Sequence, residues 1–228
     1  MFYLLVAVAG LLAEALKANT SLLELELGSN GAGAEGAVLL ADALKHNSAL
    51  ERLDLSANGV GIGGAVLLAE AFKVNFTLTA LELGANGVGA KGARMLAEVL
   101  KAGSALRRLG LRCNELGDGG CRSICAALEC NKTLRELSLA GNGIGAEGAA
   151  CAAEMLRGGN RSLALLDLRR NPGVGAAGGT ALLGALAENR GLTSLDLAGC
   201  ALGDATRRVA AALGANSTLC VFNGVCFR

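Results

Sequence analysis

The chain has 228 residues, of which 52% are hydrophobic and 3% aromatic, and its 21 basic and 20 acidic residues give a net charge of +1. A charge so close to zero excludes a global attraction to nucleic acid or anionic lipid, and the shortage of aromatic rings disfavours stacking on bases. No uninterrupted apolar run reaches the roughly 18 residues that a membrane-spanning helix requires. We therefore predict no nucleic-acid partner and no membrane partner.

The first segment, MFYLLVAVAGLLAEALKANTS, is apolar enough to suggest a secretory signal peptide. However, no Lys or Arg precedes the apolar stretch, as is usual in such a peptide. The sequence GLLAEALKANTSL from Gly10 also aligns with VLLADALKHNSAL from Val38, 28 residues later. We therefore expect this segment to form the helix of a truncated first repeat, and we place the protein in the cytoplasm.

One short pattern, LxxLxLxxN, then recurs seven times along the chain. The copies start at Leu22, Leu50, Leu78, Leu106, Leu134, Leu163 and Leu192. The spacing is 28 residues between the first five copies, and 29 residues before each of the last two. A fixed period in this range is typical of solenoids, whose units bury their apolar faces against their neighbours. The repeats predict a single domain over residues 1–228, with truncated repeats at both ends.

The unit from Leu50 to Thr77 shows how one repeat folds. Leu53 and Leu55 alternate with polar residues, which predicts a short strand, and apolar residues from Ala65 to Phe72 follow at helical spacing. Repetition of this unit gives a parallel β-sheet with helices on its other face. Because helices are wider than strands, the array should curve into an α/β horseshoe with the sheet on its concave face. We expect about eight helices and seven full strands, with an eighth strand starting near Leu219.

Asparagine recurs at two places in the repeat. The first column follows each strand and should bond the backbone of the turn, since buried polar groups must be paired. It consists of Asn30, Asn58, Asn86, Asn114, Asn142 and Asn171, with Cys200 in the seventh place. The second column lies near the helix ends, where a left-handed asparagine can close a helix. It consists of Asn19, Asn47, Asn75, Asn131, Asn160, Asn189 and Asn216.

Glycines follow the first asparagine column and reproduce the GxGxxG dinucleotide fingerprint five times, from Gly31, Gly59, Gly87, Gly143 and Gly173. A nucleotide site requires one such loop with an acidic partner about 20 residues further on. Five copies instead indicate a structural turn in each repeat. We therefore predict no cofactor.

The eight cysteines and the single histidine offer little chemistry. Cys121 and Cys125 stand where sister repeats carry alanine, so we expect reduced, structural thiols, with a disulfide framework as the alternative. Zinc ligands usually come in closely spaced pairs, often with His, but only these two cysteines are so spaced and His46 is two repeats away. No nucleophile with a base and an orienting group can be assembled, so we predict no metal site and no enzyme.

The pattern LxxLxLxxN, a glycine-rich turn and GAxxLAxALKxN covers nearly the whole chain and resembles leucine-rich repeats of the ribonuclease-inhibitor type. It is similar to the leucine-rich regions of NOD-like receptors and, more distantly, to the Ran GTPase-activating protein. The resemblance implies a non-catalytic scaffold that binds a protein partner along its concave face. The alternative is a GTPase-activating or enzyme-inhibiting module, although the acidic tail of the Ran activator has no counterpart here.

Outward strand positions supply the candidate binding surface. One column holds five acidic residues in seven repeats, and arginines interrupt the acidic series at the fourth repeat. The partner-binding candidates are Glu24, Glu26, Arg52, Asp54, Glu82, Arg108, Arg112, Arg135, Asp167, Arg169 and Asp196. The simpler interpretation is a solvated face in which Arg52 neutralises Glu24 and Asp54. The functional interpretation is an acidic half beside a basic patch that orients a partner of complementary charge.

The two ends of the chain, MFYLLVAVAG and CVFNGVCF, are both apolar, whereas a solenoid requires polar caps. We therefore expect either self-association through the ends or further repeats that flank this chain.

Overall fold

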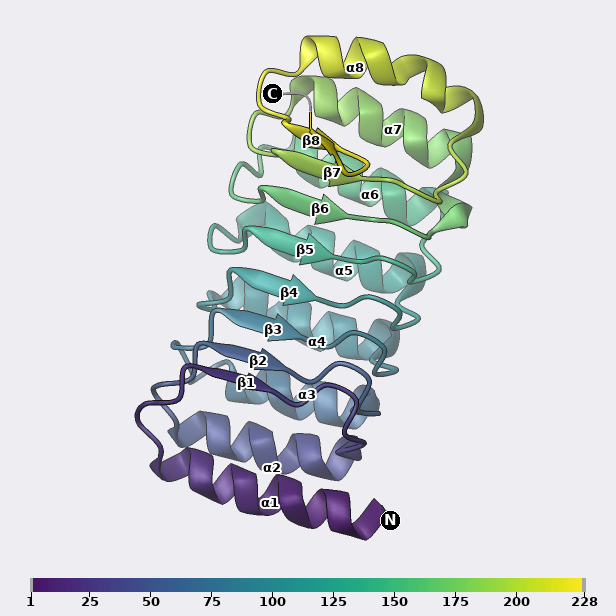
Figure 1. Cartoon of the computed structure of the whole chain (residues 1–228). Coiled ribbons are helices and arrows are strands. Elements are labelled where there is room, and N and C mark those ends of the chain that lie inside the picture. The colour runs from purple at the N-terminus through teal and green to yellow at the C-terminus, as the bar shows by residue number, and fades with distance from the viewer. Residues whose placement is uncertain (1, 227–228) are drawn as a thin grey trace.

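The computed structural model describes residues 2–226 of the chain, with side chains from Val8 onward. Within this range helices and strands alternate in a regular stack (Figure 1). The α-helices are α1 (Phe2–Ala18), α2 (Gly33–His46), α3 (Gly61–Ala71), α4 (Gly89–Ala102), α5 (Gly117–Cys130), α6 (Ala146–Arg157), α7 (Gly175–Glu188) and α8 (Val209–Ala215). The strands are β1 (Glu24–Glu26), β2 (Arg52–Asp54), β3 (Ala80–Glu82), β4 (Arg108–Gly110), β5 (Glu136–Ser138), β6 (Leu165–Asp167), β7 (Ser194–Asp196), β8 (Val221–Phe222) and β9 (Val225–Cys226). Short 3-10 helices, η1 (Pro172–Val174) and η2 (Gly203–Arg208), precede α7 and α8.

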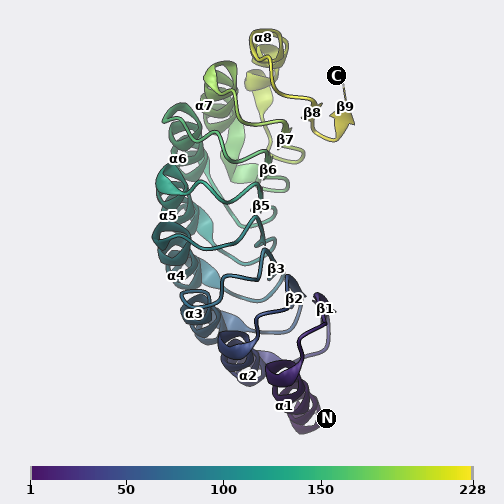
Figure 2. The same ribbon diagram turned by 90° about the vertical axis from the view of Figure 1, so that its left-hand side faces the viewer.

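The strands form one sheet in chain order, in which β1 to β8 are all parallel. Figure 2 shows the sheet on the inside of an arc and the helices on its outside. The predicted α/β solenoid with a concave parallel sheet is therefore confirmed. Among the described helices, each one contacts only helices of the adjacent repeats, as in other linear arrays.

The apolar positions of each repeat build the core between the two layers. The middle residue of each strand points inward, and Leu53, Leu81 and Leu109 are fully or almost fully buried. Ala13 and Leu16 of α1 are buried as well, and α1 packs beside α2. Helix α1 therefore occupies the helix position of a repeat next to α2.

The three glycines of the GxGxxG copy at Gly59 have two different roles. Gly59 and Gly61 have φ values of 70° and 63°, a left-handed backbone that glycine adopts without steric cost, and they form the turn that leads into α3. Gly64 lies inside α3, where an added Cβ would be 2.6 Å from Val60 Cγ1 and 2.8 Å from Ala37 Cβ. The expectation of a structural turn holds for the first two glycines, whereas the third permits close contact between α2 and α3.

The first asparagine column bonds backbone groups of its own repeat and of the preceding one. Asn114 is fully buried, and its Nδ2 donates to the carbonyls of Leu83 at 2.8 Å and Arg112 at 3.2 Å. Its Oδ1 accepts the N–H groups of Asn86 at 2.9 Å and Val88 at 3.1 Å. In the seventh place the Cys200 thiol donates to the Leu168 carbonyl at 3.0 Å.

The second asparagine column forms a similar series at the other end of the strands. Asn47 Nδ2 donates to the Leu16 and Asn19 carbonyls at 2.8 and 2.9 Å, and its Oδ1 accepts the Leu50 N–H at 2.8 Å. The predicted left-handed backbone is wrong, because Asn47 has φ −79° and ψ 131°. This extended conformation lets the side chain reach both the preceding repeat and the turn that leads to the next strand.

The last strands depart from the repeat, because β9 turns back and pairs antiparallel with β8. Asn223 and Gly224 connect them with φ values of 50° and 77°, as a type I′ hairpin turn requires. Asn223 Oδ1 also accepts the Leu197 N–H at 2.7 Å, a group that in earlier repeats donates to the next strand. The Asn-Gly pair is a hairpin signal that our sequence interpretation of an uncapped apolar end missed. The first seven side chains and residues 227–228 lie outside the described residues, so self-association or flanking repeats remain predictions.

Candidate protein-binding surface

The concave face presents the outward side chains of the strands in parallel rows. One row contains Glu24, Arg52 and Arg108, and the next contains Glu26, Asp54, Glu82, Asp167 and Asp196. Arg112 and Arg169 lie just beyond the ends of β4 and β6, and Arg135 immediately precedes β5. Arg135 Nη1 donates to the Ser162 carbonyl at 2.8 Å. The structure thus places the predicted site residues along one face of the sheet, but it distributes them over seven strands.

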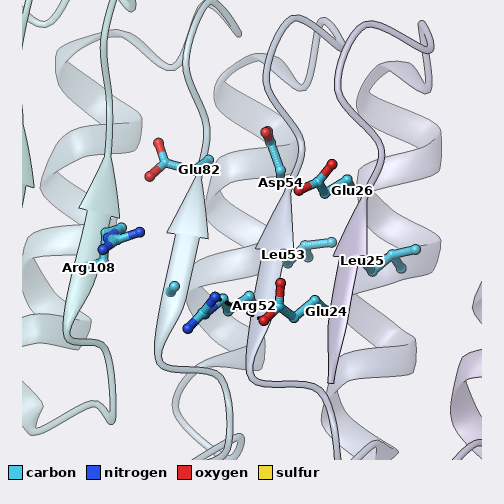
Figure 3. Close-up of a pocket in the computed structure, with 9 residues that line it drawn as sticks. Glu24, Leu25, Glu26, Arg52, Leu53, Asp54, Glu82 and Arg108 are labelled. Atoms are coloured by element: carbon cyan, nitrogen blue, oxygen red, sulfur yellow. Dashed lines mark hydrogen bonds and ion pairs between the residues drawn. The ribbon is translucent and has the colours of Figure 1, made fainter. Parts of the chain in front are cut away.

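Three acidic side chains from consecutive strands lie side by side, and we call Glu26, Asp54 and Glu82 the acidic row. They line a hollow together with Glu24, Arg52 and Arg108 (Figure 3). Neighbouring strands are about 4.8 Å apart, so the carboxylates repel one another unless counter-charges or solvent intervene. Within residues 2–226 no member of the row forms an ion pair.

The acidic row ends at Gly110, which has no side chain. The carboxyl group of Glu82 from the neighbouring strand fills the space that a side chain would take. A Cβ atom on Gly110 would overlap the carboxyl group of Glu82. In the opposite direction, Arg112 lies over Gly84, where an added Cβ would be 2.8 Å from Arg112 Nε. Burial, reinforced by the nearby charge of Asp54, raises the pKa of the half-buried Glu82 carboxyl.

Arginines neutralise the first outward row. Arg52 Nη1 is 2.9 Å from Glu24 Oε1, and Arg108 makes a bidentate pair with Glu136 at 2.7 and 3.1 Å. Of the two acidic residues that Arg52 could neutralise, it pairs with Glu24 and not with Asp54, whose Oδ1 accepts the Ser56 N–H at 2.7 Å. These pairs are exposed, and such pairs contribute roughly 0–1 kcal/mol each to stability.

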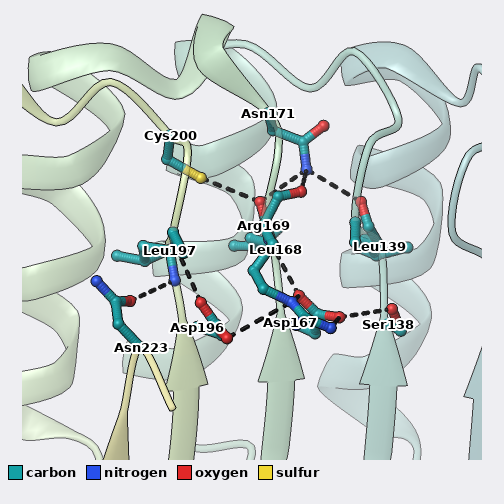
Figure 4. A network of polar contacts seen from close by, with 12 residues as sticks. Ser138, Leu139, Asp167, Leu168, Arg169, Asn171, Asp196, Leu197, Cys200 and Asn223 are labelled. Carbon is teal, nitrogen blue, oxygen red and sulfur yellow. Dashed lines mark hydrogen bonds and ion pairs between the residues drawn. The ribbon is translucent and has the colours of Figure 1, made fainter. Parts of the chain in front are cut away.

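A tighter polar network holds the acidic residues of β6 and β7 (Figure 4). Arg169 Nε and Nη2 each donate to the Asp167 carboxylate at 3.0 Å, and Asp196 Oδ2 is 3.5 Å from Arg169 Nε. Ser138 Oγ donates to Asp167 Oδ2 at 2.9 Å. Burial alone would raise the pKa of Asp167, but the hydrogen bonds from Arg169 and Ser138 outweigh it and lower that pKa. Among the described residues, the acidic row of β1–β3 is thus the part of the column that forms no ion pair.

Neutralising Glu82 and neutralising Asp167 should therefore change the free energy of unfolding in opposite directions. The raised pKa of Glu82 disfavours its charge in the folded state, so Glu82→Gln should increase the free energy of unfolding at neutral pH. The lowered pKa of Asp167 favours its charge, so Asp167→Asn should decrease it. The Glu82 difference should disappear as the pH falls from its raised pKa to below the ordinary value of 4.5, whereas the Asp167 difference should disappear only as the pH falls from 3.8 through its lowered pKa. Urea unfolding of both variants at neutral and acidic pH measures this, and equal signs at neutral pH would contradict it.

Other chemistry is sparse on the described surface. The His46 ring Nδ1 lies 3.0 Å from the Asp42 carbonyl at the end of α2, away from the sheet. Among residues 2–226 no three His, Cys, Asp or Glu side chains are grouped in a way that could hold a metal ion. None of the described helices is long and apolar enough to cross a membrane.

Comparison of the concave sheet and its repeats with known proteins identifies the family. No curated protein matches the sequence significantly. Among solved structures, the leucine-rich repeat-containing protein LegL7 from Legionella pneumophila has a TM-score of 0.55 and 20% identity, over 90% of this chain and 76% of that one. The Leiomodin-1 Actin-Binding Site 2 structure matches at a TM-score of 0.39 and 18% identity, over 90% and 86%. A family model described as Leucine Rich repeat matches more than half of the chain, at residues 18–41, 46–69, 74–97, 105–125, 130–151 and 188–205. The chain therefore belongs to the leucine-rich repeat family.

Proposed function

We propose that this chain is a non-catalytic scaffold that binds a partner protein through the concave face of its sheet. The observation that carries the proposal is the acidic row, which lies in register on β1–β3 and forms no ion pair among the described residues. Repulsion among these carboxylates is relieved when a basic surface docks against them. The hollow lined by these residues gives such a surface a place to bind.

The acidic and basic residues lie in different parts of the array, and this separation would fix the direction in which a partner docks. The acidic row belongs to the first three strands, whereas exposed arginines cluster around β4–β6, at Arg107, Arg108, Arg112, Arg135, Arg169 and Arg170. Complementary charge patterns fix the register of a complex and accelerate association more than they increase affinity. The outward positions of β1–β7 carry no aromatic side chain, the usual source of binding hot spots. We therefore expect an electrostatic interface that weakens as salt concentration increases.

Charge reversal with a matched control tests the proposal. Glu26, Asp54 and Glu82 would be replaced by lysine in one variant, and the exposed helix residues Glu35, Glu98 and Glu129 in the other, so that both change net charge equally. Partners captured by the natural chain and identified by mass spectrometry are then quantified on each variant. Selective loss on the concave variant is expected, provided that both variants retain their circular dichroism spectra. Equal recovery on both variants would refute binding at the acidic row.

The finer classification is also our proposal. A full helix of 11–14 residues in most repeats supports the ribonuclease-inhibitor type of array, to which NOD-like receptor repeats are similar. No described feature favours the alternative of a GTPase-activating module over the scaffold. A stimulated-GTPase assay separates the two, and acceleration by this chain would replace the scaffold proposal.

A further inference from the structure

A second hollow on the concave side lies beyond the ends of β4, β5 and β6. We call it the arginine hollow, and its lining consists of Arg112, Cys113, Ala140, Gly141, Arg169 and Arg170. No acidic side chain lines it. Gly141 keeps it open, because a Cβ on this residue would lie 3.1 Å from Cys113 Sγ. The hollow is thus a small basic site, separate from the acidic row.

The repeat itself does not require these arginines. At the sequence position of Arg112 and Arg169 the other repeats carry small residues, namely Gly28, Ser56, Gly84, Ala140 and Ala198. The three guanidinium groups come from two repeats that flank one with Ala140, so that the small residue leaves space between them. All three arginines are exposed, and burial therefore does not account for their presence.

The pairing of each guanidinium determines what the hollow can bind. Arg169 is held in place by Asp167 and Asp196, and its bidentate pair uses Nε and Nη2, which leaves both N–H groups of Nη1 as donors. Arg112 and Arg170 form no ion pair within residues 2–226, although the charge of Arg112 acts on Glu82. Two unpaired positive charges match a phosphate monoester, which carries about −1.5 to −2 at neutral pH, better than a carboxylate. The planar fork of arginine also fits phosphate oxygens in a bidentate manner.

We infer that the arginine hollow binds the phosphate group of a phosphoserine or phosphothreonine in the partner protein. The inference rests on the proposed function, because it assigns a chemistry to a partner docked on the same face. The partner would then make two contacts with the concave face. A basic surface of the partner would dock on β1–β3, and a phosphorylated residue would bind near β4–β6. Recognition of the partner would then depend on its phosphorylation.

Cys113 provides a direct reporter, because its exposed thiol lines the hollow. The full chain is mixed with short, otherwise identical peptides that carry phosphoserine, serine or glutamate, and alkylation is followed by mass spectrometry. The phosphoserine peptide should slow alkylation of Cys113 and leave that of the exposed Cys130 unchanged. In a second measurement, the same three peptides carry a fluorescent label, and fluorescence anisotropy gives their affinities. The phosphoserine peptide should bind about tenfold more tightly than either of the others, as expected for charge-assisted bonds to a doubly charged group.

Variants assign the effect to the arginines. Arg112→Gln combined with Arg170→Gln should abolish the phosphoserine preference, whereas Arg122→Gln combined with Arg207→Gln changes net charge equally on the helix side and should preserve it. Equal binding of the three peptides, equal protection by a single-stranded oligonucleotide, or an unchanged preference in the first variant would each overturn the inference. Such a failure is distinct from that of the scaffold proposal, which the acidic-row variant tests without phosphopeptides.

Discussion

Replacement of Asn114 by alanine should lower the free energy of unfolding by about 3 kcal/mol, the largest effect that we expect from a single polar side chain in this protein. The residue is fully buried, and its amide group satisfies two N–H groups and two carbonyls. Alanine would leave several of these groups buried without a partner, and each one costs about 1–3 kcal/mol. Urea unfolding monitored by circular dichroism measures the difference.

Asn30→Ala is the matched control for this experiment. Asn30 belongs to the same column but is exposed, and its Nδ2 bonds only the Leu27 and Gly28 carbonyls of its own turn. Water can replace these bonds after the substitution, so the loss should be at most about 1 kcal/mol. Equal losses of stability in the two variants would show that the hydrogen bonds between repeats do not contribute to the stability of the protein.

Gly64→Ala should destabilise the protein by about 1–3 kcal/mol, even though alanine is the better helix former. The new methyl group would be 2.6 Å from Val60 Cγ1 and 2.8 Å from Ala37 Cβ, far inside contact distance. Relief requires α2 and α3 to separate, which disturbs the packing of both repeats. Thermal unfolding by calorimetry measures the change in stability.

The adjacent Gly63→Ala supplies the opposite result within the same helix. Nothing lies within 4 Å of a Cβ on Gly63, and the residue is exposed. Alanine should therefore stabilise α3 by about 0.5–1 kcal/mol through its helix propensity alone. If both substitutions moved stability in the same direction, close helix packing would not explain the third glycine of the motif.

The period of the sequence predicted the fold because each repeat presents the same apolar positions to the same neighbours. Leu53 and its equivalents determine the register of the sheet, and the prediction needed no detail of side-chain conformation. The eighth strand also begins close to Leu219, at Val221. The helix-end asparagines were misjudged because residue type alone does not distinguish a left-handed cap from an extended residue whose side chain bonds the next turn.

The details of the candidate site depend on which neighbour each flexible side chain selects, and sequence does not determine that choice. Arg52 could reach Glu24 or Asp54, and the structure pairs it with Glu24. Arg169 was predicted as a binding residue without any indication that it would hold Asp167. The sequence did contain one useful signal for the arginine hollow, since Arg112 and Arg169 depart from the small residues of their sister repeats.

The interlocking side chains between β3 and β4 have a consequence for how the two candidate binding areas influence one another. β3 and β4 are neighbouring strands, and the helices α4 and α5 of the same two repeats are in contact as well. There Glu82 lies over Gly110 and Arg112 lies over Gly84, each side chain reaching across to the other strand. A partner that draws Glu82 toward itself also removes a negative charge from the vicinity of Arg112. Occupation of the acidic row would thereby make the arginine hollow more attractive to an anion, and binding at the two areas would be cooperative.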